Sequence, residues 1–218
     1  MNYNKIKLIH NDLNKIWKQV PVDYYDQGIK TNLLQKIWHN YKLRTFKDIV
    51  KGRKIDSILD VGCASGMLTN EIAKTFLKSK IYGVDIYEDA LVFARKKYPS
   101  VNFIVADAHK LPFKTNTFDL TVCYETIEHV VDPLKALKEI RRVTKKGGIS
   151  ILAMDSGSLL FKIVWLLWEN SKGKVWKGAH LHPFTHRELE NIIKKSGFII
   201  KQKYFSHLGM EVIFLLIK

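Results

Sequence analysis

The stretch that decides the fold is residues 58–66, Ile-Leu-Asp-Val-Gly-Cys-Ala-Ser-Gly. An apolar strand runs into a turn with two glycines, and the residues from Met67 onward have the spacing of a helix. Because glycine lacks a Cβ, Gly62 and Gly66 would let the backbone approach a ligand closely, and the N–H groups at the helix start would face it. The pattern predicts a strand, a tight turn and a helix that together cradle a ligand.

Acidic side chains end three successive predicted strands. Asp60 lies just before the first glycine, Asp85 ends the second strand and Asp107 follows the third. Since the carboxyl ends of parallel strands meet at one edge of a sheet, we expect these carboxylates to line one crevice. Asp85 stands about twenty residues beyond the glycine turn, where a carboxylate binds the hydroxyls of a ribose. A nucleoside is expected. A dinucleotide is not expected. The dinucleotide-binding fingerprint needs a third glycine where Met67 follows the turn, and Asp60 would repel a pyrophosphate.

Four motifs along the chain resemble those of the class I S-adenosylmethionine-dependent methyltransferases, of the type 11 and ubiquinone-biosynthesis-like subgroup. They read LDVGCASG at 59–66, VDIYEDAL at 84–91, VADAHKLPF at 105–113 and FDLTVCYETIEHV at 118–130. The resemblance extends from about residue 55 to residue 152. One departure is Ala64, where the family usually has glycine, and we expect the added methyl group to be tolerated.

The resemblance implies S-adenosylmethionine as the cofactor and relates residues to its parts. Asp60 and the turn from Gly62 to Gly66 would surround the methionine part, Asp85 would bind the ribose, and Asp107 with Ala108 would meet the adenine. The full expected cofactor-binding set is Asp60, Gly62, Cys63, Ala64, Gly66, Asp85, Ile86, Asp107, Ala108 and Tyr124.

The alternation of strand and helix patterns indicates an α/β fold with a doubly wound, mostly parallel seven-stranded sheet, the Rossmann-like methyltransferase fold. We predict strands at 58–61, 80–84, 102–105, 118–123, 149–154, 198–205 and 210–217, the last two antiparallel at one edge. Residues 1–50 would form a helical N-terminal lid, and residues 51–218 the methyltransferase domain with a cap insertion at about 155–185. The lid candidates are Tyr24, Tyr25, Trp38 and His39.

The composition limits the expected cellular compartment and the expected binding partners. The chain has 218 residues, a net charge of +15 and a pI of about 9.7, and a basic surface attracts phosphates. However, arginine is scarce and lysine is spread over the whole length, which favours a solvated surface over a nucleic-acid site. The two cysteines, the charged N-terminus and the absence of an apolar run of about 20 residues predict a cytoplasmic protein without disulfides.

Residues 124–130, Tyr-Glu-Thr-Ile-Glu-His-Val, are the strongest candidates for chemistry on the acceptor. A helical turn would place Glu125, Glu128 and His129 on one face, where they could act as a general base without a metal, which is the favoured expectation. In similar ubiquinone-pathway O-methyltransferases and small-RNA 3′-end 2′-O-methyltransferases, matching residues hold a divalent ion. The resemblance therefore implies a second option, a Mg²⁺ or Mn²⁺ site made by Glu125, Glu128, His129 and His182.

Residues 159–168 are apolar and aromatic and are too short to span a bilayer. They would form a wall of an acceptor pocket or a helix at a membrane surface, and Trp176, His180, His182 and His186 follow them. We therefore expect methyl transfer to a small-molecule or lipid-linked acceptor, at oxygen, with a peripheral membrane contact. The alternative is an RNA 2′-O-methyltransferase with a divalent metal, but nucleic acid is the less favoured partner because no RNA-binding signature is present.

Overall fold

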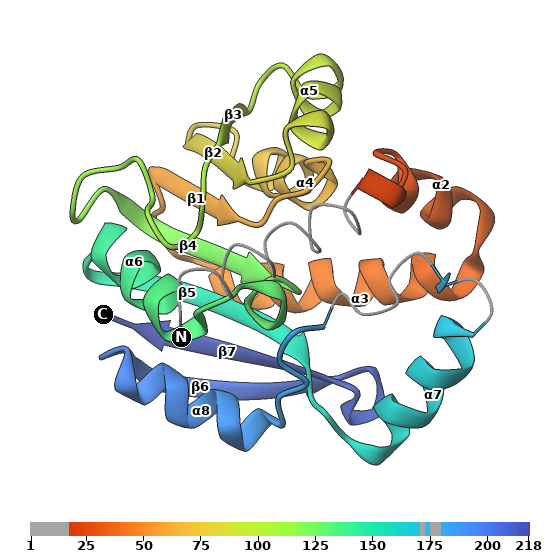
Figure 1. Ribbon diagram of the computed structural model, residues 1–218. Coiled ribbons are helices and arrows are strands. Elements are labelled where there is room, and N and C mark those ends of the chain that lie inside the picture. The colour runs from red at the N-terminus through yellow and green to blue at the C-terminus, as the bar shows by residue number, and fades with distance from the viewer. Residues whose placement is uncertain (1–17, 171–172, 175–179) are drawn as a thin grey trace, which may run out of the picture.

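A seven-stranded sheet runs through the protein, with its strands in the order β3-β2-β1-β4-β5-β7-β6 (Figure 1). The computed structural model describes residues 18–170, 173–174 and 180–218. Neighbouring strands are parallel except where they pair with β7, which is antiparallel to both β5 and β6. The strands are Ser57–Val61 (β1), Lys80–Asp85 (β2), Asn102–Val105 (β3), Phe118–Tyr124 (β4), Thr144–Asp155 (β5), Ile199–Ser206 (β6) and Glu211–Ile217 (β7).

Helices cover both faces of the sheet, and local signals fix where some of them begin. Asp132 caps α6 by accepting a hydrogen bond of 3.0 Å from the Lys135 N–H, and Pro133 occupies the first turn. Thr185 and Glu188 form a reciprocal capping box at the start of α8. The α-helices are Tyr24–Thr31 (α2), Leu33–Val50 (α3), Met67–Thr75 (α4), Glu88–Lys97 (α5), Pro133–Val143 (α6), Leu159–Glu169 (α7) and His186–Lys195 (α8), and the 3₁₀ turns are Ile127–His129 (η1) and His207–Gly209 (η3).

Two apolar cores lie on the two faces of the sheet. The first contains Phe46 of α3 and Leu91 of α5, packed with Ile58 of β1. The second contains Leu137 of α6 and the next residue of β1, Leu59. Successive residues of β1 therefore enter different cores, as expected for a parallel strand that is buried on both faces. This burial fixes the strand ends on which the site is built.

The predicted seven-stranded, mostly parallel α/β sheet is confirmed, and most predicted bounds differ by only one or two residues. The largest difference is at β5, which begins at Thr144 rather than at residue 149. Thr144 already pairs with Phe118, before an irregularity in the register that follows Phe118. The last two strands are antiparallel to each other, as predicted, but β7 lies inside the sheet and only β6 is at the edge.

The expected lid is only partly separate from the core. Phe46 and Val50, near the end of α3, are buried in the first core. The apolar residues at the start of α3 are exposed, with Leu33 and Leu34 at 70% and 76%. The start of α3 extends past the carboxyl ends of the strands (Figure 1). Residues 1–17 of the expected lid lie outside the described residues.

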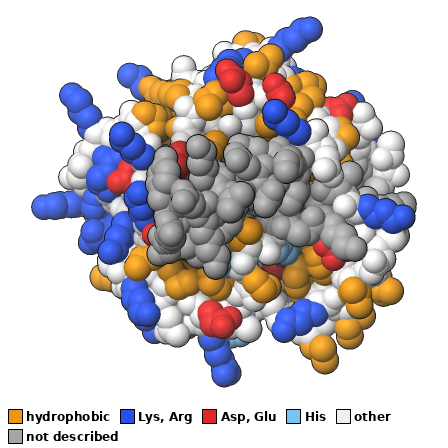
Figure 2. Space-filling view, in the orientation of Figure 1, with side chains coloured by type: hydrophobic (Ala, Val, Ile, Leu, Met, Phe, Trp, Pro, Cys, Tyr) orange, Lys and Arg blue, Asp and Glu red, His pale blue; other side chains and the backbone are white. Residues whose placement is uncertain are grey.

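Helix α7 of the predicted cap insertion presents an apolar surface to solvent. None of its residues is buried, and Leu159 and Leu167 are 75% and 68% exposed. Figure 2 shows apolar side chains gathered at the lower right, over the place of α7 in Figure 1. Within the described parts of the chain, no helix combines the length and apolarity needed to cross a bilayer. Trp176, also expected in the cap, lies outside the described residues.

Candidate cofactor and acceptor site

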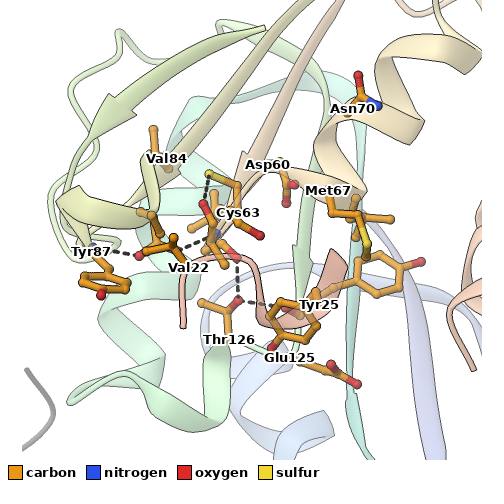
Figure 3. Close-up of a pocket in the computed structure, with 18 of the residues that line it drawn as sticks. Val22, Tyr25, Asp60, Cys63, Met67, Asn70, Val84, Tyr87, Glu125 and Thr126 are labelled. Atoms are coloured by element: carbon orange, nitrogen blue, oxygen red, sulfur yellow. Dashed lines mark hydrogen bonds between the residues drawn. The ribbon is translucent and has the colours of Figure 1, made fainter. Parts of the chain in front are cut away.

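A cavity of about 650 Å³ lies at the carboxyl ends of β1, β2 and β4 and is bordered by α2 and α3. Every residue of the expected cofactor set lines it except Gly66. Of the lid candidates, Tyr25 and His39 line it, whereas Trp38 stacks on His207 with ring centroids 3.7 Å apart. In Figure 3, Asp60 lies beside the glycine turn, and Tyr25 lies beside Glu125 and Thr126. The volume is in the range of small-ligand sites.

The turn after β1 has the left-handed backbone that glycine favours. Gly62 and Gly66 both have φ of 77°, and Ala64 between them has φ of 46°. The geometry gives a further reason for glycine at these positions, beside the close approach of a ligand expected from the sequence. A Cβ on Gly62 would collide with Thr126, and one on Gly66 would lie 2.5 Å from the Phe103 ring. The chain's own packing therefore also requires glycine at these two positions.

Asp60 is a buried carboxylate at the floor of the cavity. It is 2% exposed, and its Oδ2 accepts a hydrogen bond of 2.7 Å from the Thr69 hydroxyl of α4. Burial raises the pKa of Asp60 to about 7, although the bond from Thr69 opposes the rise. A cationic group in the cavity would therefore find a carboxylate that ionises easily near neutral pH.

Asp85 joins the end of β2 to the glycine turn. Its Oδ2 accepts from the Ala64 N–H at 2.8 Å and its Oδ1 from the Tyr87 N–H at 2.9 Å. Burial raises the pKa of Asp85, and these backbone bonds oppose the rise. The carboxylate is thus held in one orientation toward the cavity, with lone pairs left to accept from a ligand hydroxyl.

Asp107 is held by a neighbouring histidine that the sequence analysis did not consider. The His109 Nε2 accepts a hydrogen bond of 3.0 Å from the Asp132 N–H, so the proton is on Nδ1. That Nδ1 lies 2.6 Å from Asp107 Oδ1, which also accepts from the His109 N–H at 2.8 Å. The Asp107 carboxylate is therefore fixed at the rim of the cavity, beside Ala108.

Glu125 is paired with a buried lysine of α3. The Lys42 ammonium forms an ion pair with Glu125 and lies 3.4 Å from Glu211 Oε1. Burial would raise the pKa of Glu125, but Lys42 outweighs it and lowers the pKa to about 2. Burial would lower the pKa of Lys42, but the two glutamates outweigh it and raise it. Glu125 is thus a fixed anion, unsuited to accept a proton at neutral pH.

The expectation of a helical turn at residues 125–129 is wrong. Glu125 has φ of 47°, and the 3₁₀ turn η1 begins only at Ile127, so Glu125 does not share a face with Glu128. Instead, ligand atoms of Glu128, His129 and His180 lie within 4.8 Å of one another. Burial raises the pKa of Glu128 to about 8. The expected histidine, His182, is stacked on Phe184 and is not in this cluster.

A second cavity, of about 320 Å³, lies on the far side of η1 under helix α7. Glu128 and His180 line it, together with aromatic side chains of Phe161, Trp165 and Phe184. His129 lines the larger cavity instead. The neighbours Glu128 and His129 therefore face different cavities, and η1 forms the partition between them.

The remaining predicted residues have structural surroundings. Cys63 and Cys123 are buried and free, and burial raises the pKa of both thiols, as fits core residues. The Tyr124 hydroxyl is buried and has no hydrogen-bond partner among the described residues, while Ile86 is 41% exposed at the cavity edge. His186 starts α8, with Nδ1 3.7 Å from Glu190.

Sequence reasoning missed several residues of the site. Lys42, Thr69 and Glu211 were not singled out because each meets its partner only through tertiary structure. The one available signal was Lys42, a charged residue within the apolar spacing of α3. Lys42 is 3% exposed. Buried lysines are rare unless they are paired, so such a position points to a buried anion nearby.

The comparisons with known proteins agree with this geometry. Residues 59–152 match the family model described as a methyltransferase domain. A ubiquinone biosynthesis O-methyltransferase of Hydrogenovibrio crunogenus is 31% identical over 67% of this chain and 63% of its own length. The mitochondrial arginine-hydroxylase NDUFAF5 of Mus musculus is 34% identical over 64% of this chain and 41% of its own length. A solved SAM-dependent methyltransferase of Thermotoga maritima has a TM-score of 0.68 at 25% identity and covers 93% of this chain and 99% of that one.

The chain belongs to the class I S-adenosylmethionine-dependent methyltransferases, as its family match, its relatives and its fold together show. The cofactor of that family is S-adenosylmethionine, and the cavity with its strand-end carboxylates fits it. The chain spans between 41% and 49% of the length of the first curated relatives. What the whole protein acts on is therefore a matter for proposal.

Proposed function

We propose that the protein transfers a methyl group from S-adenosylmethionine to an oxygen atom of a small-molecule or lipid-linked acceptor. The observation that carries this is one continuous cavity, lined both by Asp60, Asp85 and Asp107 and by Glu125 and His129. A nucleoside held by the strand-end carboxylates would place its reactive end toward the second group.

Different residues would bind the cofactor and align the acceptor. The carboxylates of Asp85 and Asp107 would accept hydrogen bonds from the nucleoside, and Asp60 would favour its cationic part. When bound, the cofactor supplies a methyl group on a positively charged sulfur, which is a good leaving group. The protein then has to align the acceptor and exclude water. Because Glu125 is a fixed anion, His129 is the better candidate to accept the hydroxyl proton.

The surroundings of the acceptor side favour an apolar acceptor. The second cavity is lined by Phe161, Trp165 and Phe184 on the far side of η1. Such aromatic lining suits a ring or a prenyl chain. The quinone-pathway name of one relative supports the same class of acceptor.

We also propose that the protein contacts a membrane surface through α7. Leu159, Leu166 and Leu167 are 75%, 59% and 68% exposed, and exposed apolar patches of this kind mark interaction sites. The net charge of +15 would strengthen attraction to anionic lipids. A lipid-linked acceptor could then approach the protein from the bilayer beside α7. The cytoplasmic location stays a prediction from the sequence.

The test is transfer of labelled methyl groups by the full chain to two separate acceptor pools. One pool contains prenylated catechols and hydroquinones in detergent, and the other contains RNA with free 2′-hydroxyl groups. We expect label in the organic phase, as an alkali-stable methyl ether. Label on RNA alone would overturn the acceptor class and support the RNA 2′-O-methyltransferase alternative. No transfer to either pool would count against oxygen methylation of these acceptors.

A further inference from the structure

The carboxylate of Glu128 is buried without a hydrogen-bond partner among the described residues. Glu128 is 2% exposed and lines the second cavity, and neither of its carboxylate oxygens is bonded to another described residue. The Nε2 atom of His182, which lines the same cavity, is also buried and has no partner in the described part of the chain. A buried carboxylate without a partner is very unfavourable. The second cavity therefore presents acceptor atoms that a ligand with N–H groups would satisfy.

Acidic side chains outnumber basic ones around Glu128. Glu128 interacts electrostatically with Glu125 and Glu211. Asp155, which also lines the second cavity, interacts with Glu128 as well. The buried Lys42 forms an ion pair with Glu125 and lies 3.4 Å from Glu211, so its charge is committed to those two glutamates. A positive charge is therefore lacking beside Glu128 and Asp155.

The described basic side chains at the second cavity do not supply this charge. Lys162 lines the cavity from α7, but it is exposed and interacts electrostatically with Glu188 of α8. His180 Nε2 lies 3.7 Å from Asp155 Oδ2, but burial lowers the pKa of His180, which favours a neutral imidazole. Glu169 adds another carboxylate to the lining. The surroundings therefore favour a ligand that brings a positive charge of its own.

The walls of the second cavity suit an organic cation. Its volume of about 320 Å³ is within the range of small-molecule sites. Phe161, Trp165 and Phe184 line it, and aromatic rings attract a cation as well as apolar carbon atoms. Trp165 is stacked on His180 with ring centroids 4.5 Å apart, and Phe184 is stacked on His182 with centroids 5.1 Å apart, so these rings are held in place. A hydrated inorganic ion would use the carboxylates but not the aromatic walls.

We propose that the second cavity binds the primary ammonium group of an otherwise apolar ligand, with Glu128 and Asp155 accepting its N–H groups and the aromatic side chains enclosing its carbon atoms. A primary ammonium has three N–H donors. A quaternary ammonium has none, so it would leave the oxygens of Glu128 without partners. Binding needs neither the cofactor nor methyl transfer, so this inference goes beyond the proposed function.

The experiment is a calorimetric titration of the full chain with phenethylamine, without cofactor and in the presence of EDTA. We expect one site per chain. Two probes of similar shape test the chemistry: phenethyl alcohol, which is neutral, and trimethylphenethylammonium, which is charged but has no N–H group. Each should bind at least tenfold more weakly than phenethylamine, which is the loss expected for one hydrogen bond between charged groups.

Substitutions in the full chain locate the site. Glu128→Gln removes the charge with little change of shape and should weaken phenethylamine binding at least tenfold, while phenethyl alcohol should bind as before. Trp165→Leu should weaken phenethylamine binding about threefold or more through loss of the cation–π contact. If Glu128→Gln does not fold, Asp155→Asn carries the comparison. The matched control is Glu190→Gln, because Glu190 pairs with Lys203 away from the cavity, and it should bind phenethylamine as the unchanged chain does.

The outcomes that would overturn the proposal are distinct. Equal affinity for phenethylamine and phenethyl alcohol would mean that the cavity recognises apolar surface alone. Quaternary binding as tight as that of phenethylamine would remove the role of Glu128 as an acceptor. Binding that appears only when a divalent ion replaces EDTA would assign the missing charge to a metal. S-adenosylmethionine binding without any phenethylamine binding would overturn this inference and leave the proposed function standing, and the reverse result would do the opposite.

Discussion

The backbone N–H of Ala64 donates a hydrogen bond of 2.8 Å to the carboxylate of Asp85, which joins the glycine turn after β1 to the end of β2. The bond depends on the left-handed conformation of Ala64, whose φ is 46°. Two parts of the expected cofactor site are therefore coupled before a ligand binds. The coupling places strain on a residue that has a Cβ.

Ala64→Gly should stabilise the protein by about 0.5–1 kcal/mol. Glycine relieves the left-handed strain, and the greater freedom of the unfolded chain cancels only part of that gain. The measurement is urea-induced unfolding. As a control, Ala73→Gly inside helix α4 should destabilise the protein by about 1 kcal/mol. Equal destabilisation by both changes would contradict the strain at Ala64.

Cofactor affinity should depend on the ionisation of Asp60, whose pKa burial raises to about 7. Without a ligand, the folded chain holds a proton that the unfolded chain releases, so the stability from Asp60 is lost as the pH rises through 7. The cationic cofactor prefers the ionised form, so its affinity should fall about tenfold from about pH 8 to about pH 6. Calorimetry on Asp60→Asn should give a weaker affinity with a flatter pH dependence. An equally steep pH dependence in Asp60→Asn would place the titrating group elsewhere.

The Lys42 ammonium stabilises two carboxylates, the partly exposed one of Glu125 and the fully buried one of Glu211. Lys42→Met should destabilise the protein by about 3–5 kcal/mol, because it leaves uncompensated buried charge. Adding Glu125→Gln should recover part of this loss, since it removes one of the unpaired charges. Thermal and urea unfolding of the single and double variants gives the interaction free energy between Lys42 and Glu125. If the two changes simply add, the buried ion pair has no role in stability.

The exposed leucines of α7 should contribute to lipid binding. Replacing Leu159 and Leu167 with Gln should reduce sedimentation with anionic liposomes at least tenfold, because each buried leucine contributes about 1.5–3 kcal/mol. Leu77→Gln is the matched control, since Leu77 is 86% exposed but follows helix α4. If the unchanged chain does not sediment with liposomes, α7 does not bind membranes and only its role as a cavity wall remains.

The parts of the site that could be predicted from the sequence are those made within one short segment. Asp60, the glycine turn and Asp85 follow strand ends directly, so the strand pattern alone places them on one edge of the sheet. Partners from distant segments could not be found this way. Lys42 reaches Glu125, and His180 reaches Glu128, only through packing of α3 and of the segment after α7 on the sheet.

The helical turn predicted at Glu125 shows a second limit. Strand β4 continues to Tyr124, and Glu125 donates its N–H to the Ala153 carbonyl oxygen at 2.8 Å in a left-handed conformation. Spacing of charged residues carries no information about such a turn. This left-handed turn separates Glu125 from Glu128, so the two residues do not form the acceptor-side set expected from the sequence.

The measurement that tests the central claim most directly is calorimetric titration of the full chain with S-adenosylmethionine and with its demethylated product. We predict one site per chain for each ligand. Asp85→Ala should lose at least tenfold in affinity, since each lost hydrogen bond to a charged group is worth about 1.5–3 kcal/mol. A folded Asp85→Ala chain that binds both ligands as the unchanged chain does, or an unchanged chain that binds neither, would contradict the account.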